Sequence, residues 1–301
     1  MALVVDCDPG TDDALALLLC AASPELDLRA VTVSGGNVAL RDTVRNACAV
    51  LGLAGCGVAV HPGADRPLRG RFVSETRVHG EAGLGGVALP EGPGASAEAA
   101  VDALRRTLRE ASAPVTLVGI APATNLALAL ASEPGLAGQV ARVVLMAGAA
   151  GEGNVTASAE FNAWSDPEAL AIVLGSGCEV VLAPLELTAQ ALVTPARIAA
   201  LRGAGKGRCL AAVCDILASV PNSPRLGGVP LHDPCTIAWL AAPSLFSSVP
   251  ARVEVLLDGV ARGRTVIERR GRAGPANAVL LDRLDADGFF ALLAERLARL
   301  P

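Results

Sequence analysis

Four aspartates stand within eight residues near the start of the chain, directly after a short apolar segment. They are the acidic members of the sequence Asp-Cys-Asp-Pro-Gly-Thr-Asp-Asp at positions 6 to 13. Two like charges about 4 Å apart repel by roughly 4 kcal/mol at an effective dielectric constant near 20, so carboxylates that face one point need a positive partner. No lysine or arginine precedes Arg29. The spacing therefore predicts a hard divalent cation with oxygen ligands, Ca²⁺ or Mg²⁺.

The backbone geometry of this motif gathers the carboxylates at the end of a strand. In a strand, residues i and i+2 share a face, so Asp6 and Asp8 should point the same way at the carboxyl end of the first strand. A Pro-Gly pair then turns the chain, and Asp12 and Asp13 open the next helix. Because ligands of open α/β sheets bind beyond the carboxyl ends of strands, we expect a site at this turn. The structural alternative is a helix cap at Asp12 or Asp13 and an ordinary hydrogen bond at Asp6.

Two further groups of polar residues stand beside predicted helices. His232 and Asp233 directly precede a helix, where they could be a packing histidine and a plain N-cap. Asn154, Glu160 and Asn162 share one loop, which combines the acceptor and amide groups that a polyhydroxyl ligand such as a sugar needs. The alternative for this loop is exposure to solvent without a ligand.

The elements that must position these groups follow an alternating pattern. Apolar runs rich in β-branched residues alternate with helical patterns, which is typical of βαβ units around a parallel sheet. We predict strands at residues 2–7, 28–34, 57–61, 115–119, 142–146, 179–183 and 252–257. We predict helices at residues 12–22, 40–53, 95–111, 123–132, 167–175, 194–202, 209–219, 234–241 and 286–300. The expected fold class is α/β, with residues 1–301 forming a single domain around an open, mostly parallel sheet with helices on both faces.

Composition excludes several classes of protein. With 301 residues, of which 52% are hydrophobic, the chain can bury a full core. The net charge is only -5 and there is no basic run, so we expect no nucleic-acid partner. No apolar run approaches the length that spans a bilayer, and the first ten residues lack the basic start of a secretory signal, so we expect a cytoplasmic protein without a membrane partner. The eight cysteines form no C-x-x-C pair and read as buried thiols.

Short motifs follow one another in order along nearly the whole chain. They are Asp-x-Asp-Pro-Gly-x-Asp-Asp at the start, Gly36-Asn37, His79-Gly80-x-x-Gly83, Thr124-Asn125-Leu126, Val143-Val144-Leu145-Met146, Glu160-Phe161-Asn162, Asp166-Pro167-Glu168-Ala169 and His232-Asp233-Pro234. In this set and order the chain resembles the inosine-uridine-preferring nucleoside hydrolases. The resemblance implies a Rossmann-like fold and a Ca²⁺-dependent enzyme that hydrolyses ribonucleosides to ribose and a purine or pyrimidine base. It also implies a homodimer or homotetramer.

The resemblance implies a Ca²⁺ ion at the bottom of the pocket. Its ligands would be Asp8, Asp13, the backbone carbonyl of Ile120 and Asp233, and the ion would also contact the ribose 2′ and 3′ hydroxyls. Asp8 would act in addition as the general base on a metal-bound water. Asp12 would bind the ribose hydroxyls. The transition state would resemble a ribosyl oxocarbenium ion, whose positive charge the neighbouring carboxylates would stabilise.

The same resemblance implies the other contacts. Asn37 and Met146 would line the sugar, and Asp6 would support the metal ligands from behind. His232 would help the departing base to accept a proton, and His79 would lie near the base. The 5′ side of the ribose would be held by three polar residues: Asn154, Glu160 and Asn162.

Two departures from the family pattern leave alternatives open. The family often has Pro-Thr-Gly-Gly-Leu-Thr-Asn where residues 119–125 read Gly-Ile-Ala-Pro-Ala-Thr-Asn, a change that a backbone carbonyl ligand tolerates. Residues 218–229 contain none of the aromatics that pack on the base in some members, which leaves base preference open and makes a nucleoside- or ribose-binding protein without turnover one alternative. A Mg²⁺-dependent phosphohydrolase of the haloacid dehalogenase type also starts with Asp-x-Asp, but Pro9-Gly10 and the single lysine, Lys206, fit it less well.

Overall fold

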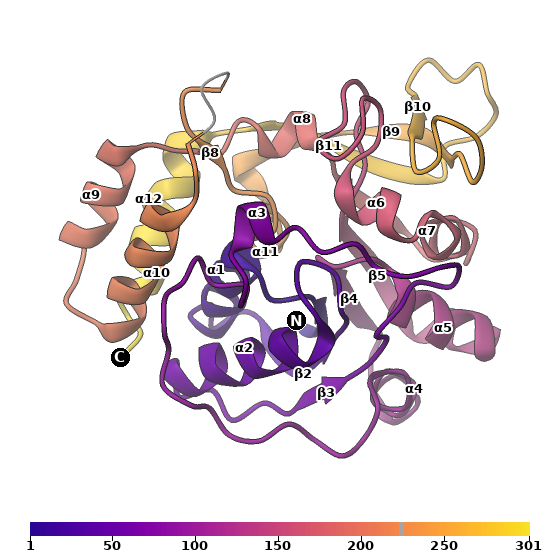
Figure 1. The fold of residues 1–301 in the computed structure, drawn as a ribbon. Helices are drawn as coiled ribbons and strands as arrows, with labels where there is room; N and C mark the ends of the chain where they lie inside the picture. The colour runs from indigo at the N-terminus through magenta and orange to yellow at the C-terminus, as the bar shows by residue number, and fades with distance from the viewer. Residues whose placement is uncertain (223–225) are drawn as a thin grey trace.

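Strands from both halves of the chain meet in one central sheet (Figure 1). A computed structural model describes residues 1–222 and 226–301. Among these residues, nine strands pair in the order β10-β9-β11-β6-β5-β4-β1-β2-β3. Their bounds in chain order are β1 Ala2–Cys7, β2 Asp27–Val33, β3 Val60–Pro62, β4 Val115–Gly119, β5 Val140–Met146, β6 Val180–Ala183, β9 Phe246–Val255, β10 Thr265–Glu268 and β11 Ala278–Leu284. A separate antiparallel pair joins β7 Leu192–Val193 to β8 Val229–Pro230.

The sheet is parallel from β11 through to β3 and antiparallel at its other end, where β9 pairs with β11 and β10 with β9. β9 begins at Phe246, six residues before the predicted strand at residue 252, and it contains Pro250. Proline lacks the N–H that a central strand needs. It is accommodated because β10 pairs only with Arg252–Val255, so on that side the first half of β9 has no partner strand among the described residues.

Helices cover both faces of the sheet and bury two separate apolar cores (Figure 1). Alternate residues of β1 point to opposite faces, so Leu3 and Val5 join one core and Val4 joins the other. The first core is covered by α1 Thr11–Ala21, α2 Leu40–Leu53, α10 Arg208–Ser219, α11 Pro234–Ala241 and α12 Ala286–Leu297. The second core is covered by α4 Ala100–Glu110, α5 Thr124–Ser132 and α7 Pro167–Leu174. The predicted fold class, an open and mostly parallel sheet with helices on both faces, is confirmed.

Several short elements were missed by the sequence prediction. They are β10, β11, α3 Thr76–His79, α6 Phe161–Ser165 and α8 Leu185–Thr188, together with the β7–β8 pair. Each of these helices spans about one turn, too short for a helical period to show, and the strands are defined by distant partners rather than by a local pattern. The remaining described helix, α9, spans Pro195–Gly203, and short 3₁₀ helices lie at Pro134–Gln139 and Pro243–Leu245.

Two further sequence expectations concern membranes and cysteines. In the described part of the chain, no helix is long and apolar enough to cross a bilayer. All eight cysteines are free thiols; six are buried and Cys56 and Cys178 are partly buried.

Candidate active site

The carboxyl ends of four neighbouring strands lie in register below one pocket. Asp6 of β1 pairs with Thr32 of β2 and Gly119 of β4, and Gly119 pairs with Leu145 of β5. The loops that leave these strands, joined by α3 and by the start of α11, enclose a cavity of about 260 Å³. Its lining includes ten of the residues predicted for the site: Asp12, Asn37, His79, Ile120, Met146, Asn154, Glu160, Asn162, His232 and Asp233.

The turn between β1 and α1 is held by the carboxylate of Asp13. Its Oδ1 accepts a hydrogen bond from the backbone N–H of Asp8 at 3.1 Å, and its Oδ2 accepts one from Gly10 at 3.0 Å. The helix therefore begins at Thr11, with Gly10 as its N-cap, one residue earlier than predicted. Asp13 combines the two roles that the sequence left open, because it closes the turn and also faces the other acids of the site.

Asn37, which follows β2, joins the two buried carboxylates. Its backbone N–H donates to Asp8 Oδ2 at 2.7 Å, while its side-chain amide donates to the Asp8 carbonyl at 3.1 Å and to Asp13 Oδ2 at 3.0 Å. The Cβ of any residue other than glycine at position 36 would lie 2.1 Å from Asp8 Oδ2, so Gly36 is required for this close approach. The main contacts of Asn37 are thus with the carboxylates, although it also lines the pocket.

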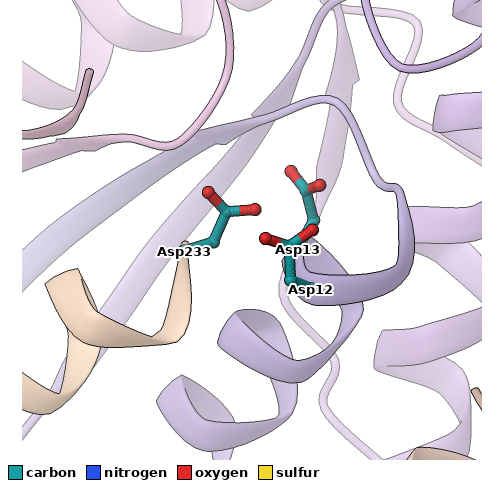
Figure 2. A group of neighbouring side chains, drawn as sticks. All are labelled: Asp12, Asp13 and Asp233. Atoms are coloured by element: carbon teal, nitrogen blue, oxygen red, sulfur yellow. The ribbon is translucent and has the colours of Figure 1, made fainter. Parts of the chain in front are cut away.

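Asp12, Asp13 and Asp233 offer carboxylate oxygens that all lie within 4.8 Å of one another (Figure 2). Asp12 and Asp13 come from the start of α1, and Asp233 from the start of α11. Although Asp233 occupies the N-cap position of α11, its side chain makes no capping hydrogen bond. Asp8 is not a member of this group, but its Oδ2 and the Oδ2 of Asp13 both accept hydrogen bonds from Asn37. We call Asp8, Asp12, Asp13 and Asp233 together the carboxylate floor. The group that could hold a metal includes Asp12, which the resemblance assigns to the ribose hydroxyls rather than to the ion.

The carboxylate floor fits a divalent cation. Asp8 Oδ1 is buried and has no hydrogen-bond partner among the described residues. The Ile120 carbonyl accepts a hydrogen bond from Asn162 Nδ2 at 3.3 Å, which leaves one of its two lone pairs for another partner. No described residue that lines the cavity is a lysine or arginine. A set of carboxylate and carbonyl oxygens without a basic neighbour is the donor set that hard cations prefer.

Burial makes the negative charge of this floor costly. It raises the pKa of Asp13 to about 7, and it raises the pKa values of Asp8 and Asp233 well above the usual range for carboxyl groups. Neighbouring carboxylates add to each shift, chiefly Asp12 for Asp13 and Asp233, and Asp13 for Asp8. A bound cation would reverse these shifts, because it favours the charged form of its ligands.

Asp6 lies beneath the floor and is tied to two neighbouring elements. Its Oδ1 accepts hydrogen bonds from Thr32 Oγ1 at 2.7 Å and from Asn125 Nδ2 at 2.9 Å. Asn125 in turn accepts a hydrogen bond from the backbone N–H of Ala64 at 2.9 Å, which anchors the loop that leads to α3. Burial raises the pKa of Asp6 to about 7.

The loop after β5 supplies the polar residues predicted for the sugar. Both oxygens of buried Glu160 accept backbone N–H donors, from Gly148, Asn162 and Ala163, at 2.8 to 3.0 Å. Burial raises the pKa of Glu160 to about 7. The Asn162 amide donates to the Met146 carbonyl at 3.0 Å, and exposed Asn154 accepts from the Phe161 N–H at 2.9 Å. Glu160 and Asn162 are thus buried and held by local hydrogen bonds, whereas Asn154 is exposed.

Two histidines that are far apart in the sequence line the pocket. His79, at the end of α3, accepts a hydrogen bond at Nδ1 from the Thr11 backbone N–H at 3.1 Å, so its neutral ring carries the proton on Nε2. Nδ1 of His232 lies 2.8 Å from Thr188 Oγ1. Burial lowers the pKa of both imidazoles, and Asp12 opposes that shift at each.

The side of the pocket between α3 and α10 is aliphatic. We call Val78, Leu217, Val220, Val229 and Pro230, which line this side, the base wall. The name follows the sequence analysis, in which the resemblance implies a base near this segment. No aromatic residue belongs to it, as the sequence indicated. Among the described residues, Phe161 is the one phenylalanine, tyrosine or tryptophan that lines the cavity.

Sequence reasoning missed Phe161, Thr11 and Glu75 as lining residues. Phe161 stands between two predicted site residues, and this position could have identified it. Thr11 lies inside the opening motif, but Glu75 carries no signal in the sequence, because the short helix α3 that follows it was not predicted.

The sequence of this chain is similar to those of known proteins. The family model described as inosine-uridine preferring nucleoside hydrolase matches residues 3–291. The pyrimidine-specific ribonucleoside hydrolase RihA of Salmonella agona (strain SL483) is 43% identical over 303 residues, which cover 98% of this chain and 97% of the relative.

Solved structures agree with this match. The purine-preferring ribonucleoside hydrolase from Gardnerella vaginalis superposes with a TM-score of 0.91 at 31% identity, covering 99% of this chain and 98% of that one. A plant nucleoside hydrolase superposes with a TM-score of 0.90 at 30% identity, again covering 99% and 98% of the two chains.

Proposed function

The chain belongs to the inosine-uridine preferring nucleoside hydrolase family, and we propose that it is a Ca²⁺-dependent enzyme whose carboxylate floor activates the water that cleaves the N-glycosidic bond. The observation that carries this proposal is the buried Asp8 Oδ1, which has no hydrogen-bond partner among the described residues, while Asp8 Oδ2 shares the donor residue Asn37 with Asp13 of the metal-capable group. Residues 1–301 would act as one catalytic domain.

The proposed metal ligands are Asp8, Asp13, the Ile120 carbonyl and Asp233, with Asp12 close enough to share the ion or to bind the ribose hydroxyls. When bound, the ion would lower the pKa of a water molecule and hold the ribose hydroxyls. The high pKa values of the floor support this assignment, because buried carboxylates without a cation tend to hold protons instead.

The proton of the attacking water would pass to Asp8. The Asn37 N–H holds Asp8 Oδ2, so Oδ1 is the oxygen left free to act. The water oxygen would bond to C1′ of the ribose as the C1′–N bond breaks, and the electron pair of that bond would leave with the base. The positive charge that develops on the sugar would be stabilised by the carboxylate of Asp12.

The other side chains would hold the sugar and assist the base. Asn154, Glu160 and Asn162 would bind the 5′ side of the ribose, and Met146 would pack against it. A carboxylate has about four lone-pair sites, so Glu160 retains acceptor capacity beyond its three backbone donors. His232 would give a proton to the departing base, and the Nε2–H of His79 would donate a hydrogen bond to it.

We also propose that pyrimidine nucleosides are the preferred substrates, that the enzyme acts in the cytoplasm, and that it is a homodimer or homotetramer. Support for the first point is the 43% identity to a hydrolase described as pyrimidine-specific, against 31% to one described as purine-preferring. The family resemblance supports the other two. Kinetics with uridine, cytidine and inosine test the first point, light scattering tests the oligomeric state, and cell fractionation tests the location.

The central test measures free ribose after incubation of the purified protein with uridine and Ca²⁺. We expect ribose release that stops in excess chelator and returns when Ca²⁺ is restored. Activity that chelation does not affect would contradict the metal assignment, and recovery with Mg²⁺ but not Ca²⁺ would contradict the choice of ion. Phosphate release from an ester, or uridine binding without ribose release, would instead support the alternatives considered from the sequence.

A further inference from the structure

His232 is hydrogen-bonded to Thr188, a residue that does not line the main pocket. Thr188 ends the short helix α8, and its side chain is fully buried. Its hydroxyl oxygen lies 2.8 Å from His232 Nδ1 and 3.3 Å from the Leu185 carbonyl oxygen, to which it donates. A hydroxyl has a single proton, so while it donates to Leu185 it can only accept from His232. In that arrangement the ring carries its proton on Nδ1.

The two partners are held by a rigid backbone frame. β7 and β8 pair as antiparallel strands, with Leu192 opposite Pro230 and Val193 opposite Val229. Next to this pair, the Leu231 N–H donates to the Ala191 carbonyl at 3.0 Å. These contacts fix the segment that carries His232 against the end of α8, so the threonine and the histidine meet without a flexible connection.

His232 stands between two cavities. It lines the main pocket, and it also lines a second cavity of about 370 Å³ with Leu185, Glu186 and Ala189 of α8 and the following turn. The imidazole therefore has space on both sides. Because the contact with Thr188 occupies Nδ1, the ring is held in one orientation and Nε2 remains as the nitrogen available to a ligand.

We infer that Thr188 is a positioning residue, which orients His232 so that Nε2 faces the leaving base. This inference rests on the proposed function, because it requires His232 to deliver the proton. The acid would be the imidazolium form of His232, which carries a proton on each ring nitrogen. Its Nε2 proton would pass to the base as the C1′–N bond breaks. This leaves a neutral ring whose Nδ1–H donates to Thr188 Oγ1, while the threonine keeps its own proton and donates it to the Leu185 carbonyl oxygen. No oxidant, reductant or co-substrate is needed.

The test compares two substrates that differ in how much the leaving group needs a proton. Uracil leaves uridine poorly as an anion, whereas 4-nitrophenolate leaves 4-nitrophenyl β-D-ribofuranoside readily without one. Thr188→Val keeps the shape of the side chain and removes the hydroxyl. We expect it to lower kcat for uridine by about 10- to 100-fold, since general acid catalysis typically contributes 10²- to 10⁴-fold, with little change for the nitrophenyl riboside. Thr188→Ser, which restores the hydroxyl, should recover most of the uridine activity.

A matched control is Thr43→Val. Thr43 is also fully buried, and its hydroxyl donates to the backbone carbonyls of Ser34 and Leu40 without lining either cavity. It should lower the unfolding temperature comparably but leave the ratio of the two kcat values unchanged. An equal loss on both substrates in Thr188→Val, or wild-type uridine turnover in that variant, would overturn the inference.

Failure of the proposed function gives a different result from failure of this inference. If the wild-type protein hydrolysed neither substrate, the function itself would be wrong. If it hydrolysed both, His232→Ala should change the ratio of kcat values in the same direction as Thr188→Val, and the double variant should be no worse than His232→Ala alone. Additive losses in the double variant would show that Thr188 does not act through His232.

Discussion

The carboxylate floor and the base wall occupy the same pocket but are built in different ways. The floor is formed at the ends of parallel strands, and each of Asp8 and Asp13 is held by backbone or amide donors. The base wall consists of aliphatic side chains from α3, from α10 and its C-cap Val220, and from β8, and these side chains have no hydrogen-bonding groups. Hydrogen bonds have strict geometry, whereas aliphatic contacts tolerate change. We therefore expect the floor to determine whether the proposed reaction occurs and the wall to influence which base is accepted.

The strongest test of this difference is Asp8→Ala in the floor. Loss of both the general base and one metal ligand should lower kcat for uridine by at least ~10³-fold, because general-base catalysis alone contributes 10²- to 10⁴-fold. The fold should remain intact, since the substitution removes a buried carboxylate whose charge is disfavoured by burial. Ribose release and circular dichroism measure the two effects. Near-normal turnover would refute the assignment of the base.

A smaller effect is expected from Asn37→Ala, which removes the two side-chain hydrogen bonds to the floor and keeps the backbone one. Partners that orient metal ligands typically contribute 10- to 100-fold in affinity, so Ca²⁺ binding measured by calorimetry should weaken by about that factor. Asn46→Ala is the matched control, because this buried amide donates to the Pro9 and Ala82 carbonyls and to no carboxylate. Equal weakening in both variants would show that the contacts with the floor are not responsible.

A third test concerns Glu160, which lines the same pocket as the floor. Its protonation should make the free energy of unfolding depend on pH. Its pKa is about 7 in the folded protein against an ordinary value of 4.5, so between these pH values the folded state keeps a proton that the unfolded state has lost. Its contribution to stability is therefore fully present below pH 4.5 and is lost as the pH rises through 7. The loss is about 3.5 kcal/mol, from a pKa difference of about 2.5 at about 1.4 kcal/mol per pKa unit.

Urea unfolding of the chelated protein from pH 5 to 8 measures this loss, and Glu160→Gln should flatten the decline. Glu160→Gln should also be less stable at every pH, because its amide N–H₂ would face backbone N–H donors. The pH dependence is read from the difference between the two slopes, so this general loss does not affect the result. Identical slopes in the two proteins would contradict the raised pKa.

The smallest effect is expected in the base wall. Val220→Ala removes two methyl groups from the pocket lining, which should change the ratio of kcat/KM for uridine and inosine by about tenfold or less and leave Ca²⁺ affinity unchanged. Val266→Ala, at an exposed position of β10, is the matched control and should change neither quantity. A loss of Ca²⁺ affinity in Val220→Ala would mean that the wall and the floor are not independent.

Local patterns predicted much of the fold and part of the site. The bounds of β1, β4 and α2 agree with the sequence prediction, because each is a clear apolar run or a clear helical period. β9 was predicted short because Pro250 interrupts its pattern, and only the pairing with β10 and β11 explains its presence there. The first motif indicated a hard metal from charge repulsion alone, but it could not show that Asp12 would share a small space with Asp233.

The sequence by itself determined that a hard cation is expected at the first turn, because Asp6, Asp8, Asp12 and Asp13 are neighbours along the chain and a strand followed by a turn must bring them together. Only the tertiary structure decided what surrounds them. The hydrogen bond of Asn125 to Asp6, and that of Thr188 to His232, join residues 119 and 44 positions apart. Such contacts depend on strand order and helix docking, which arise from the packing of two whole cores and leave no local pattern in the chain.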